Sequence, residues 1–145
     1  MAEGLRVLAG IDGSASAVRA CRTAAAMLPP GTEVVLLVVL SYELDPYTLL
    51  GEEGPETGEM LERVTDAVEA AAGEAREVLV GTGFPVTVTH RFGNPADEIL
   101  AQAEETGPGL IVLGRRGLGA PKRWLLGSVS DRVMHHAQAP VLVVS

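Results

Sequence analysis

Apolar residues along the chain follow two patterns in turn, which predicts alternating strands and helices. Short runs in which nearly every residue is apolar predict buried strands, and the clearest is 33–40, EVVLLVVL. Between these runs apolar residues recur every three or four positions, which indicates amphipathic helices. The predicted strands are 5–11, 33–40, 85–92, 110–113 and 141–145. The first predicted helix ends at residue 28, and the other three span about 59–80, 95–106 and 128–137.

The order of these elements predicts an α/β fold. Strands joined by helices run parallel with right-handed crossovers, so helices cover both faces of the sheet. The pattern alone does not choose the strand order. In the doubly wound order 3-2-1-4-5, ligands bind beyond the carboxyl ends of strands 1 and 4. Asp12 follows the first of these strands and Gly114 follows the other, which predicts a ligand site that includes both.

The long helix predicted at 59–80 begins after a segment of different composition. Residues 41–58 contain five acidic residues, two prolines and three glycines but no basic residue, which predicts a flexible, acidic surface loop. The apolar stripe of the helix itself consists of Met60, Leu61, Val64, Val68, Ala71, Ala75 and Val78.

Length and composition limit the class of protein. We expect a single domain over residues 1–145, because this length with 47% apolar residues can bury a sizeable core. No apolar run approaches the ~18–20 residues that span a bilayer, so we expect no membrane association. The N-terminus lacks the pattern of a signal peptide, so we expect a cytoplasmic location. The single cysteine, Cys21, lies at an apolar position of a helical pattern and is interpreted as a core residue.

Charge is distributed unevenly along the chain. A net charge of −8 argues against nucleic-acid binding, because phosphate backbones repel an acidic surface. Residues 106–130 nevertheless contain no acidic residue. The same window contains four cations, namely Arg115, Arg116, Lys122 and Arg123. This local reversal predicts a site for a small anion.

The glycines of the segment 114–130, GRRGLGAPKRWLLGSVS, indicate a phosphate as that anion. Gly114 and Gly117 can adopt positive φ and turn backbone N–H groups toward a phosphate. Gly127 precedes a helix start, where Ser128 and Ser130 add hydroxyl donors to the unpaired N–H groups. Neither the Walker pattern nor GxGxxG fits the segment. The alternative that the glycines only form turns and the serines only cap a helix stays open.

The spacing of these residues resembles a known signature. Gly114-Arg115-Arg116-Gly117, nine residues and then Gly127-Ser128 are similar to the G-2x-G-9x-G-(S/T) motif of the universal stress protein family, in its ATP-binding branch. The segments LAGIDGS, GNPADEIL and GSVSDRVMHHAQAPVLVV extend the resemblance over essentially the whole chain. The resemblance implies a three-layer, Rossmann-like fold of the adenine nucleotide alpha hydrolase type, with sheet order 3-2-1-4-5. It also implies a homodimer and an ATP ligand whose phosphates would hold any Mg2+.

Matching positions in the family imply the residues that contact the nucleotide. Asp12 would contact the ribose, Gly10 and Ile11 would lie beside the nucleoside, and Val39 would meet adenine through its backbone. The residues that would surround the ribose and phosphates are Leu113, Gly114, Arg116, Gly117, Gly127, Ser128, Val129 and Ser130. Val38 stands where many members have histidine, which leaves the glycine motif untouched.

These observations favour an ATP-binding regulatory or sensor module in the stress response, with at most slow ATP hydrolysis and no catalytic residues. Two alternatives stay open. The chain could be a slow ATPase or phosphotransferase that uses Asp12 and a divalent metal, or a pure protein-interaction module. The strand at 140–145 is an apolar sheet edge in the 3-2-1-4-5 order, and its pairing with a second copy predicts a homodimer.

Overall fold

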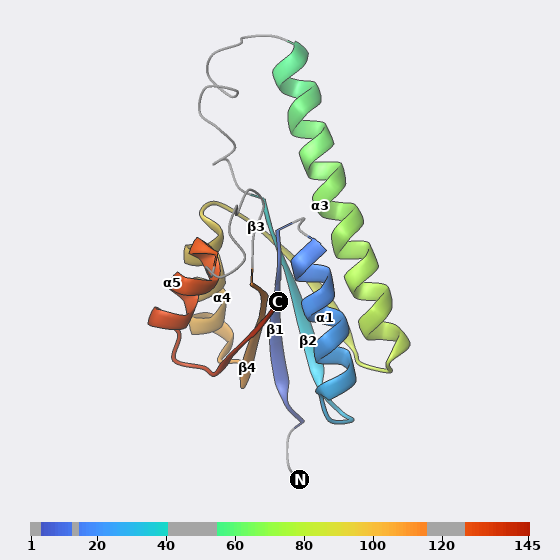
Figure 1. Ribbon diagram of the computed structural model, residues 1–145, viewed down its shortest axis with the longest axis vertical. Helices are drawn as coiled ribbons and strands as arrows, with labels where there is room; N and C mark the ends of the chain where they lie inside the picture. Colours follow the sequence, from blue (N-terminus) through green and yellow to red (C-terminus); the bar gives the residue numbers. More distant parts are fainter. Residues whose placement is uncertain (1–3, 13–14, 41–54, 116–126) are drawn as a thin grey trace.

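The fold is a parallel five-stranded sheet between two layers of helices (Figure 1). The computed structural model describes residues 4–12, 15–40, 55–115 and 127–145, and for residues 55–64 it describes the backbone alone. The strands are β1 (Arg6–Ile11), β2 (Glu33–Leu40), β3 (Val86–Phe92), β4 (Leu110–Gly114) and β5 (Val141–Val144). The helices are α1 (Ala15–Met27), α3 (Pro55–Gly81), α4 (Pro95–Thr106) and α5 (Ser128–His136). The sheet order β3-β2-β1-β4-β5 confirms the predicted α/β fold.

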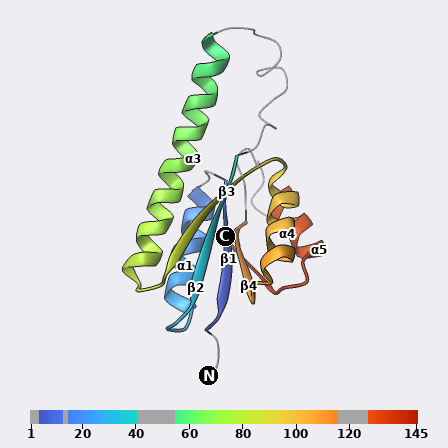
Figure 2. The same cartoon turned by 180° about the vertical axis from the view of Figure 1, so that it is seen from behind.

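Each face of the sheet has its own apolar core. Figure 2 shows α1 and α3 against one face and α4 with α5 against the other. Strand β2 serves both cores, because Leu36 and Val38 pack toward α1 and α3 whereas Leu37 and Val39 pack toward α4 and α5. Successive strand residues point to opposite faces, so a strand covered on both sides must be apolar throughout. This requirement explains the continuous run EVVLLVVL.

The register brings the ends of β1 and β4 together. The two strands pair in parallel, from Val7 with Leu110 to Ala9 with Val112, and Ile11 lies beside Val38 of β2. After β1 the chain enters α1 on one face, and after β4 it reaches α5 on the other face (Figure 1). The carboxyl ends of β1 and β4 therefore form the switch point at which open α/β sheets bind ligands.

Local contacts define both ends of α4. Asn94 Oδ1 accepts a hydrogen bond from the Asp97 N–H over 3.2 Å, and Pro95 occupies the first turn. The helix ends at Gly107, whose φ of 59° lies in the left-handed region that favours glycine. Local sequence chemistry therefore fixes both ends of α4.

Helix α3 differs from its prediction at its start and in its buried stripe. It begins at Pro55, so residues 55–58 of the predicted loop are helical, and proline is compatible with a first helical turn. The remainder of that loop, 41–54, lies outside the described residues. From residue 65 onward, where its side chains are described, the buried positions are Val68, Ala72, Ala75 and Leu79. The predicted stripe residues Met60, Leu61 and Val64 lie before that range. The sequence pattern places Ala71 and Val78 in the stripe, whereas the helix is rotated enough to bury the larger Leu79 and leaves those two residues half-buried.

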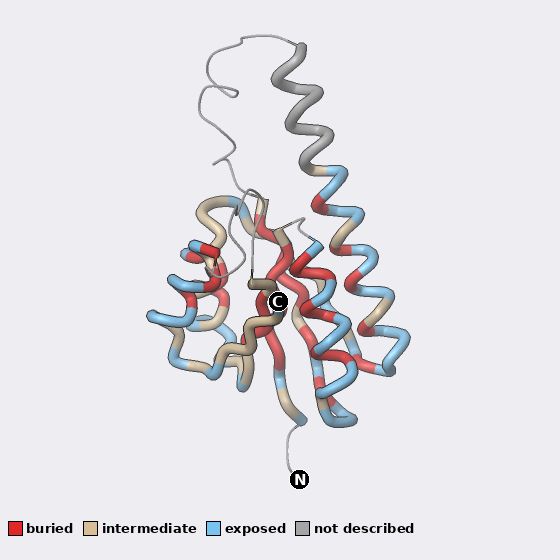
Figure 3. Tube along the Cα trace, in the orientation of Figure 1, coloured by how far each residue is buried: buried red, intermediate tan, exposed pale blue. Residues whose placement is uncertain are grey.

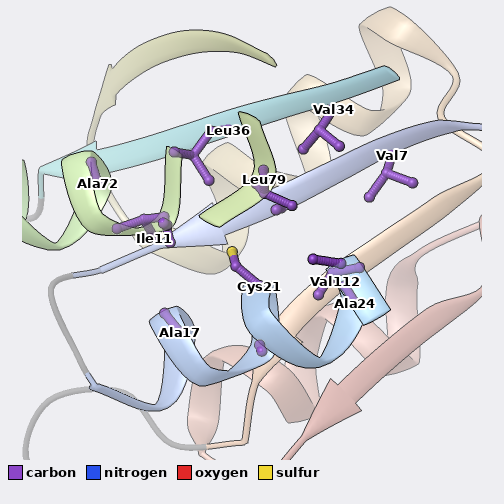
Figure 4. Close-up of a cluster of buried hydrophobic side chains, with 14 of the residues drawn as sticks. Val7, Ile11, Ala17, Cys21, Ala24, Val34, Leu36, Ala72, Leu79 and Val112 are labelled. Atoms are coloured by element: carbon purple, nitrogen blue, oxygen red, sulfur yellow. The ribbon is translucent and has the colours of Figure 1, made fainter. Parts of the chain in front are cut away.

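The core between the sheet and α1 with α3 contains the single cysteine. Buried residues line the inner surfaces of the layers in Figure 3, and Cys21 lies among Ile11, Leu79 and Val112 in Figure 4. Cys21 is 1% exposed, and burial raises the pKa of its thiol to about 12. The thiol is therefore protonated at neutral pH and unreactive, as expected of a core residue. Among the described helices, none has the length and apolar character needed to cross a membrane.

Candidate functional site

A pocket lies at the carboxyl ends of β1 and β4, where the first turns of α1, α4 and α5 converge. It is an open depression, and the space between its walls amounts to about 360 Å3 when the open mouth is included. The residues that line it are Gly10, Ile11, Asp12, Ala17, Val39, Pro95, Ile99, Leu113, Gly114, Val129 and Ser130.

The structure brings together most of the residues that the sequence singled out. Those that line the pocket are Gly10, Ile11, Asp12, Val39, Leu113, Gly114, Val129 and Ser130. Gly127 and Ser128 directly precede Val129, at the start of α5, but do not belong to the lining. Arg116 and Gly117 lie outside the described residues. The strand ends and the start of α5 thus meet where the topology predicts.

Gly10 keeps the apolar floor of the pocket open. A Cβ at this position would lie 2.9 Å from Leu113 Cδ2 and 3.1 Å from Ile99 Cδ1. Val39, Ile99 and Leu113 all belong to the apolar core on the α4 and α5 face. The missing side chain of Gly10 therefore leaves a space between β1 and α4 that is walled by aliphatic groups, a surface suited to a flat apolar ring.

Gly114 is required for a different reason from the one predicted. Positive φ occurs among the described glycines at Gly31, Gly83, Gly93 and Gly107, and Gly114 is not one of them. A Cβ on Gly114 would instead lie 2.6 Å from the carbonyl carbon of Ser16 and 2.7 Å from the backbone nitrogen of Ala17. The expectation of a positive φ is therefore wrong at Gly114. Because residue 114 has no side chain, the first turn of α1 can pack directly on the end of β4.

The start of α5 has backbone donors for which no described residue supplies an acceptor. The first helical hydrogen bond runs from the Asp131 N–H to the Gly127 carbonyl over 3.0 Å, and the Gly127 N–H bonds the Arg115 carbonyl over 2.7 Å. The N–H groups of Ser128, Val129 and Ser130 precede that first bond. Gly127 supplies no side-chain cap. These donors and the positive end of the helix dipole together favour an anion.

The Ser130 hydroxyl has a partner within the protein. Ser130 is 2% exposed, and its Oγ donates to the Gly114 carbonyl over 2.8 Å, with the Arg115 carbonyl 3.3 Å away. The sequence predicts this hydroxyl as a phosphate donor, whereas here it ties the end of β4 to the first turn of α5. Ser128 is exposed, which leaves its hydroxyl at the solvent side of the same turn.

Asp12 provides the charge of the pocket. It is half-buried at the end of β1, and no other described lining residue is ionisable. Among the described residues, no group of three or more histidine, cysteine, aspartate or glutamate side chains could hold a metal ion. The site therefore combines one carboxylate, an apolar floor and a helix start rich in donors.

Three lining residues were missed by the sequence analysis, namely Ala17, Pro95 and Ile99. Pro95 and Ile99 lie one turn apart on α4, and Ala17 lies in the first turns of α1. In the predicted fold each helix begins close to the carboxyl end of the strand before it, and this was an available signal for these residues. It does not reveal how far each helix reaches across that edge.

Comparisons with known proteins agree with this architecture. The model of the universal stress protein family matches residues 5–145. A universal stress protein of Thermus aquaticus is 39% identical over 139 residues, which cover 95% of this chain and 96% of that protein. Matched segments cover 47% of a Bacillus subtilis relative and 47% of a Mycolicibacterium smegmatis relative.

Solved structures share the fold over the whole chain. The structure of protein MJ0577 is 28% identical and superposes with a TM-score of 0.77, covering 99% of this chain and 96% of that chain. The same name belongs to a universal stress protein of Methanocaldococcus jannaschii. A universal stress protein in complex with cAMP is 23% identical, with a TM-score of 0.68 and 99% coverage of both chains, a likeness that shows the fold.

Proposed function

The chain belongs to the universal stress protein family, and we propose that it binds an adenine nucleotide, ATP above all, as a regulatory or sensor module in the stress response. The observation that carries the proposal is the pocket at the ends of β1 and β4. It places an apolar floor on the side of α4 and unpaired backbone N–H groups on the side of α5. A nucleotide has the same division between an apolar base and an anionic phosphate chain.

The pocket suggests how the nucleotide lies. The base occupies the space that Gly10 leaves between Ile99 and Leu113, with the backbone of Val39 at its edge. The carboxylate of Asp12 accepts hydrogen bonds from the ribose hydroxyls. The phosphates lie at the N–H groups of Ser128, Val129 and Ser130. Arg116 and Gly117 of the family motif are proposed to complete the phosphate side.

The proposed contacts can supply micromolar affinity. Micromolar affinity requires about 8 kcal/mol. Hydrogen bonds to a charged phosphate contribute about 1.5–3 kcal/mol each, so several backbone donors and an apolar base site reach this value after the costs of association. A universal stress protein of the same fold is described in complex with cAMP, which supports an adenine nucleotide as the ligand class.

Binding rather than turnover is the function that the described pocket supports. Asp12 is the one ionisable residue of the described lining, and a ribose contact would engage its carboxylate. A thousandfold catalytic effect requires about 4 kcal/mol of stabilisation specific to the transition state. We therefore propose at most slow hydrolysis, with any Mg2+ held by the ATP phosphates.

The edge strand β5 is proposed to pair with a second copy of the chain. It lies at one edge of the sheet, and its four residues Val141–Val144 are all partly exposed. An apolar edge strand left bare invites association, and a two-fold axis would close it. We expect a dimer mass by light scattering at micromolar concentration, and a monomer mass would contradict this assembly. We further propose that the chain works as a single domain in the cytoplasm.

Isothermal titration calorimetry with ATP, with and without Mg2+, tests the nucleotide site. We expect micromolar binding that Asp12→Ala weakens by about tenfold, the effect of one lost hydrogen bond to a charged group. Asp66→Ala is the matched control, because Asp66 is an exposed aspartate of α3 remote from the pocket lining. Absence of ATP binding by the folded wild-type protein would overturn the proposal.

A further inference from the structure

One peptide group lies between the start of α5 and the edge strand β5. It consists of the Gly114 carbonyl and the Arg115 N–H, which share one rigid plane because the peptide bond does not rotate freely. The Gly114 carbonyl accepts a hydrogen bond from the Ser130 hydroxyl over 2.8 Å, and the Arg115 N–H donates to the Val144 carbonyl over 2.7 Å. We call this peptide group with its two hydrogen bonds the peptide bridge. It connects Ser130 of the pocket lining to Val144, the last residue of β5.

The α5 end of the peptide bridge lies at the proposed phosphate position. Ser130 is 2% exposed, and its N–H is one of the three that precede the first helical hydrogen bond. A further hydrogen bond, from the Gly127 N–H to the Arg115 carbonyl over 2.7 Å, fastens the same turn to the end of β4. Hydrogen bonds in series also polarise and strengthen one another. An anion bound to the N–H groups of this turn therefore restrains the Ser130 hydroxyl and the bridge with it.

The β5 end of the peptide bridge holds the strand edge that is proposed to pair with a second copy. The Pro140 and Val144 carbonyls accept hydrogen bonds from the Ile111 and Arg115 N–H groups. Backbone groups of successive strand residues point to opposite sides, so those of Val141 and Val143 face the open edge of the sheet. Loss of the bridge would free the Val144 carbonyl and let the end of β5 fray. The backbone groups that a partner strand must meet would then lose their fixed position.

We propose that the peptide bridge couples nucleotide binding to the β5 edge, so that bound ATP holds this edge in the form that pairs with a second copy. The inference rests on the proposed nucleotide site and the proposed dimer, and it gives the Ser130 hydroxyl a positioning role. The end of β5 opens and closes locally, and ATP binds the form in which the first turn of α5 and the bridge are in place. Such coupling is reciprocal: the dimer binds ATP more tightly by the factor by which ATP tightens the dimer.

Sedimentation velocity over a dilution series, with and without ATP, tests the coupling on the full chain. In the wild type, saturating ATP is expected to lower the Kd of the dimer by about fivefold or more, as is typical of coupled sites. In Ser130→Ala, at an ATP concentration that saturates the variant, the Kd of the dimer should change by less than about twofold. Thr106→Ala is the matched control. It removes a hydroxyl that donates to the Gln102 carbonyl over 2.8 Å, away from the bridge, and should keep the wild-type response.

Hydrogen exchange of the Arg115 amide, followed by NMR, reports on the peptide bridge itself and does not require a dimer. ATP at about 100 times its Kd can slow exchange through local opening by up to about a hundredfold, and we expect at least about tenfold slowing in the wild type. In Ser130→Ala at matched saturation, the slowing should fall below about threefold, because β5 then opens without disturbing α5. The two wild-type measurements decide the question even where Ser130→Ala fails to fold.

The outcomes separate this inference from the proposals on which it rests. ATP binding that changes neither the Kd of the dimer nor the Arg115 exchange in the wild type would overturn the coupling and leave the nucleotide site in place. Equal responses of the wild type and Ser130→Ala would also overturn it, because the effect would then bypass the bridge. Slowed Arg115 exchange in a monomeric wild type would support the bridge and contradict the dimer. Absence of ATP binding in calorimetry would contradict the nucleotide proposal and the coupling together.

Discussion

Helices α4 and α5 both begin at the pocket, but their first turns differ in what they leave for a ligand. In α4, Pro95 has no N–H, the Asp97 N–H is bonded to Asn94, and the Glu98 N–H bonds the Asn94 carbonyl. The first turn of α4 also contains two acidic residues. In α5, three N–H groups precede the first helical bond, no side chain caps the helix, and the acidic residue of the turn comes only at Asp131.

This difference shows how one fold divides a pocket into two halves. The start of α4 has acceptors for the Asp97 and Glu98 N–H groups and is negatively charged, so it suits an uncharged base and repels phosphate. The start of α5 leaves donors and the dipole uncompensated, so it suits an anion. The two glycines follow the same division: a Cβ on Gly10 would meet movable side-chain ends, whereas one on Gly114 would meet the backbone of α1.

The glycine pair gives the largest expected effect. Gly114→Ala should lower the free energy of unfolding by about 2–3 kcal/mol, because α1 must move away from β4. Gly10→Ala should cost about 1 kcal/mol or less, because Leu113 and Ile99 can change rotamer, although it should weaken ATP binding. Chemical denaturation of both variants measures the difference. Equal losses of stability would contradict the claim that Gly114 packs against fixed backbone whereas Gly10 packs against side chains that can move.

The second test gives the start of α5 the charge that α4 already has. Ser128→Asp adds a carboxylate at an exposed first-turn position, and we expect about a tenfold loss of ATP affinity from repulsion. The same carboxylate should stabilise the ligand-free protein by about 0.3–1 kcal/mol through the helix dipole. Calorimetry and thermal unfolding measure the two effects, with Ser128→Ala as the control for the lost hydroxyl. Unchanged ATP affinity would contradict the phosphate position.

The third test removes the cap of α4. Asn94→Ala should lower the free energy of unfolding by about 1 kcal/mol, because the Asp97 N–H loses its acceptor. ATP affinity should change little, since no phosphate is placed there. Asn94→Asp keeps an acceptor at the same position and should restore most of the stability. A loss of ATP affinity as large as that of Ser128→Asp would show that both helix starts bind the phosphates.

The smallest effect is expected for the ion pair that joins the two helices. Arg132 Nη2 lies 2.7 Å from Asp97 Oδ1, and both side chains are about half exposed. Arg132→Gln should therefore lower the free energy of unfolding by only about 0.5 kcal/mol, and less at high salt. Denaturation at low and high ionic strength checks this value. A loss above about 1 kcal/mol would indicate that the two halves are held together more strongly than exposed charges allow.

Much of this division can be read from the sequence. The continuous run of 33–40 predicts a strand buried on both faces, and the structure places β2 at the same residues. The GNPADE segment predicts the cap of α4 because its hydrogen bonds are local. The position of Asp12 and Gly114 at one pocket follows from the strand order, which depended on the 3-2-1-4-5 hypothesis and the family resemblance.

The remaining features depend on contacts between distant segments. The need for Gly114 comes from the backbone of Ser16, about a hundred residues away in sequence, so the local expectation of positive φ was wrong. Ser130 likewise bonds a carbonyl sixteen positions earlier, which no helix-capping rule indicates. Pro95 and Ile99 reach the pocket only because of the way α4 packs against β2, β3 and α5. Such approaches are set by packing rather than by local pattern.

The central claim is that α5, and not α4, receives the phosphates of an adenine nucleotide. Its most direct test is a titration of 15N-labelled protein with ATP, followed by the backbone amide resonances. The amides of Ser128, Val129 and Ser130 should show the largest shifts, whereas those of Asp97 and Glu98 should move little. Saturable shifts centred on the first turn of α4, or no saturable shifts in either turn, would contradict the account.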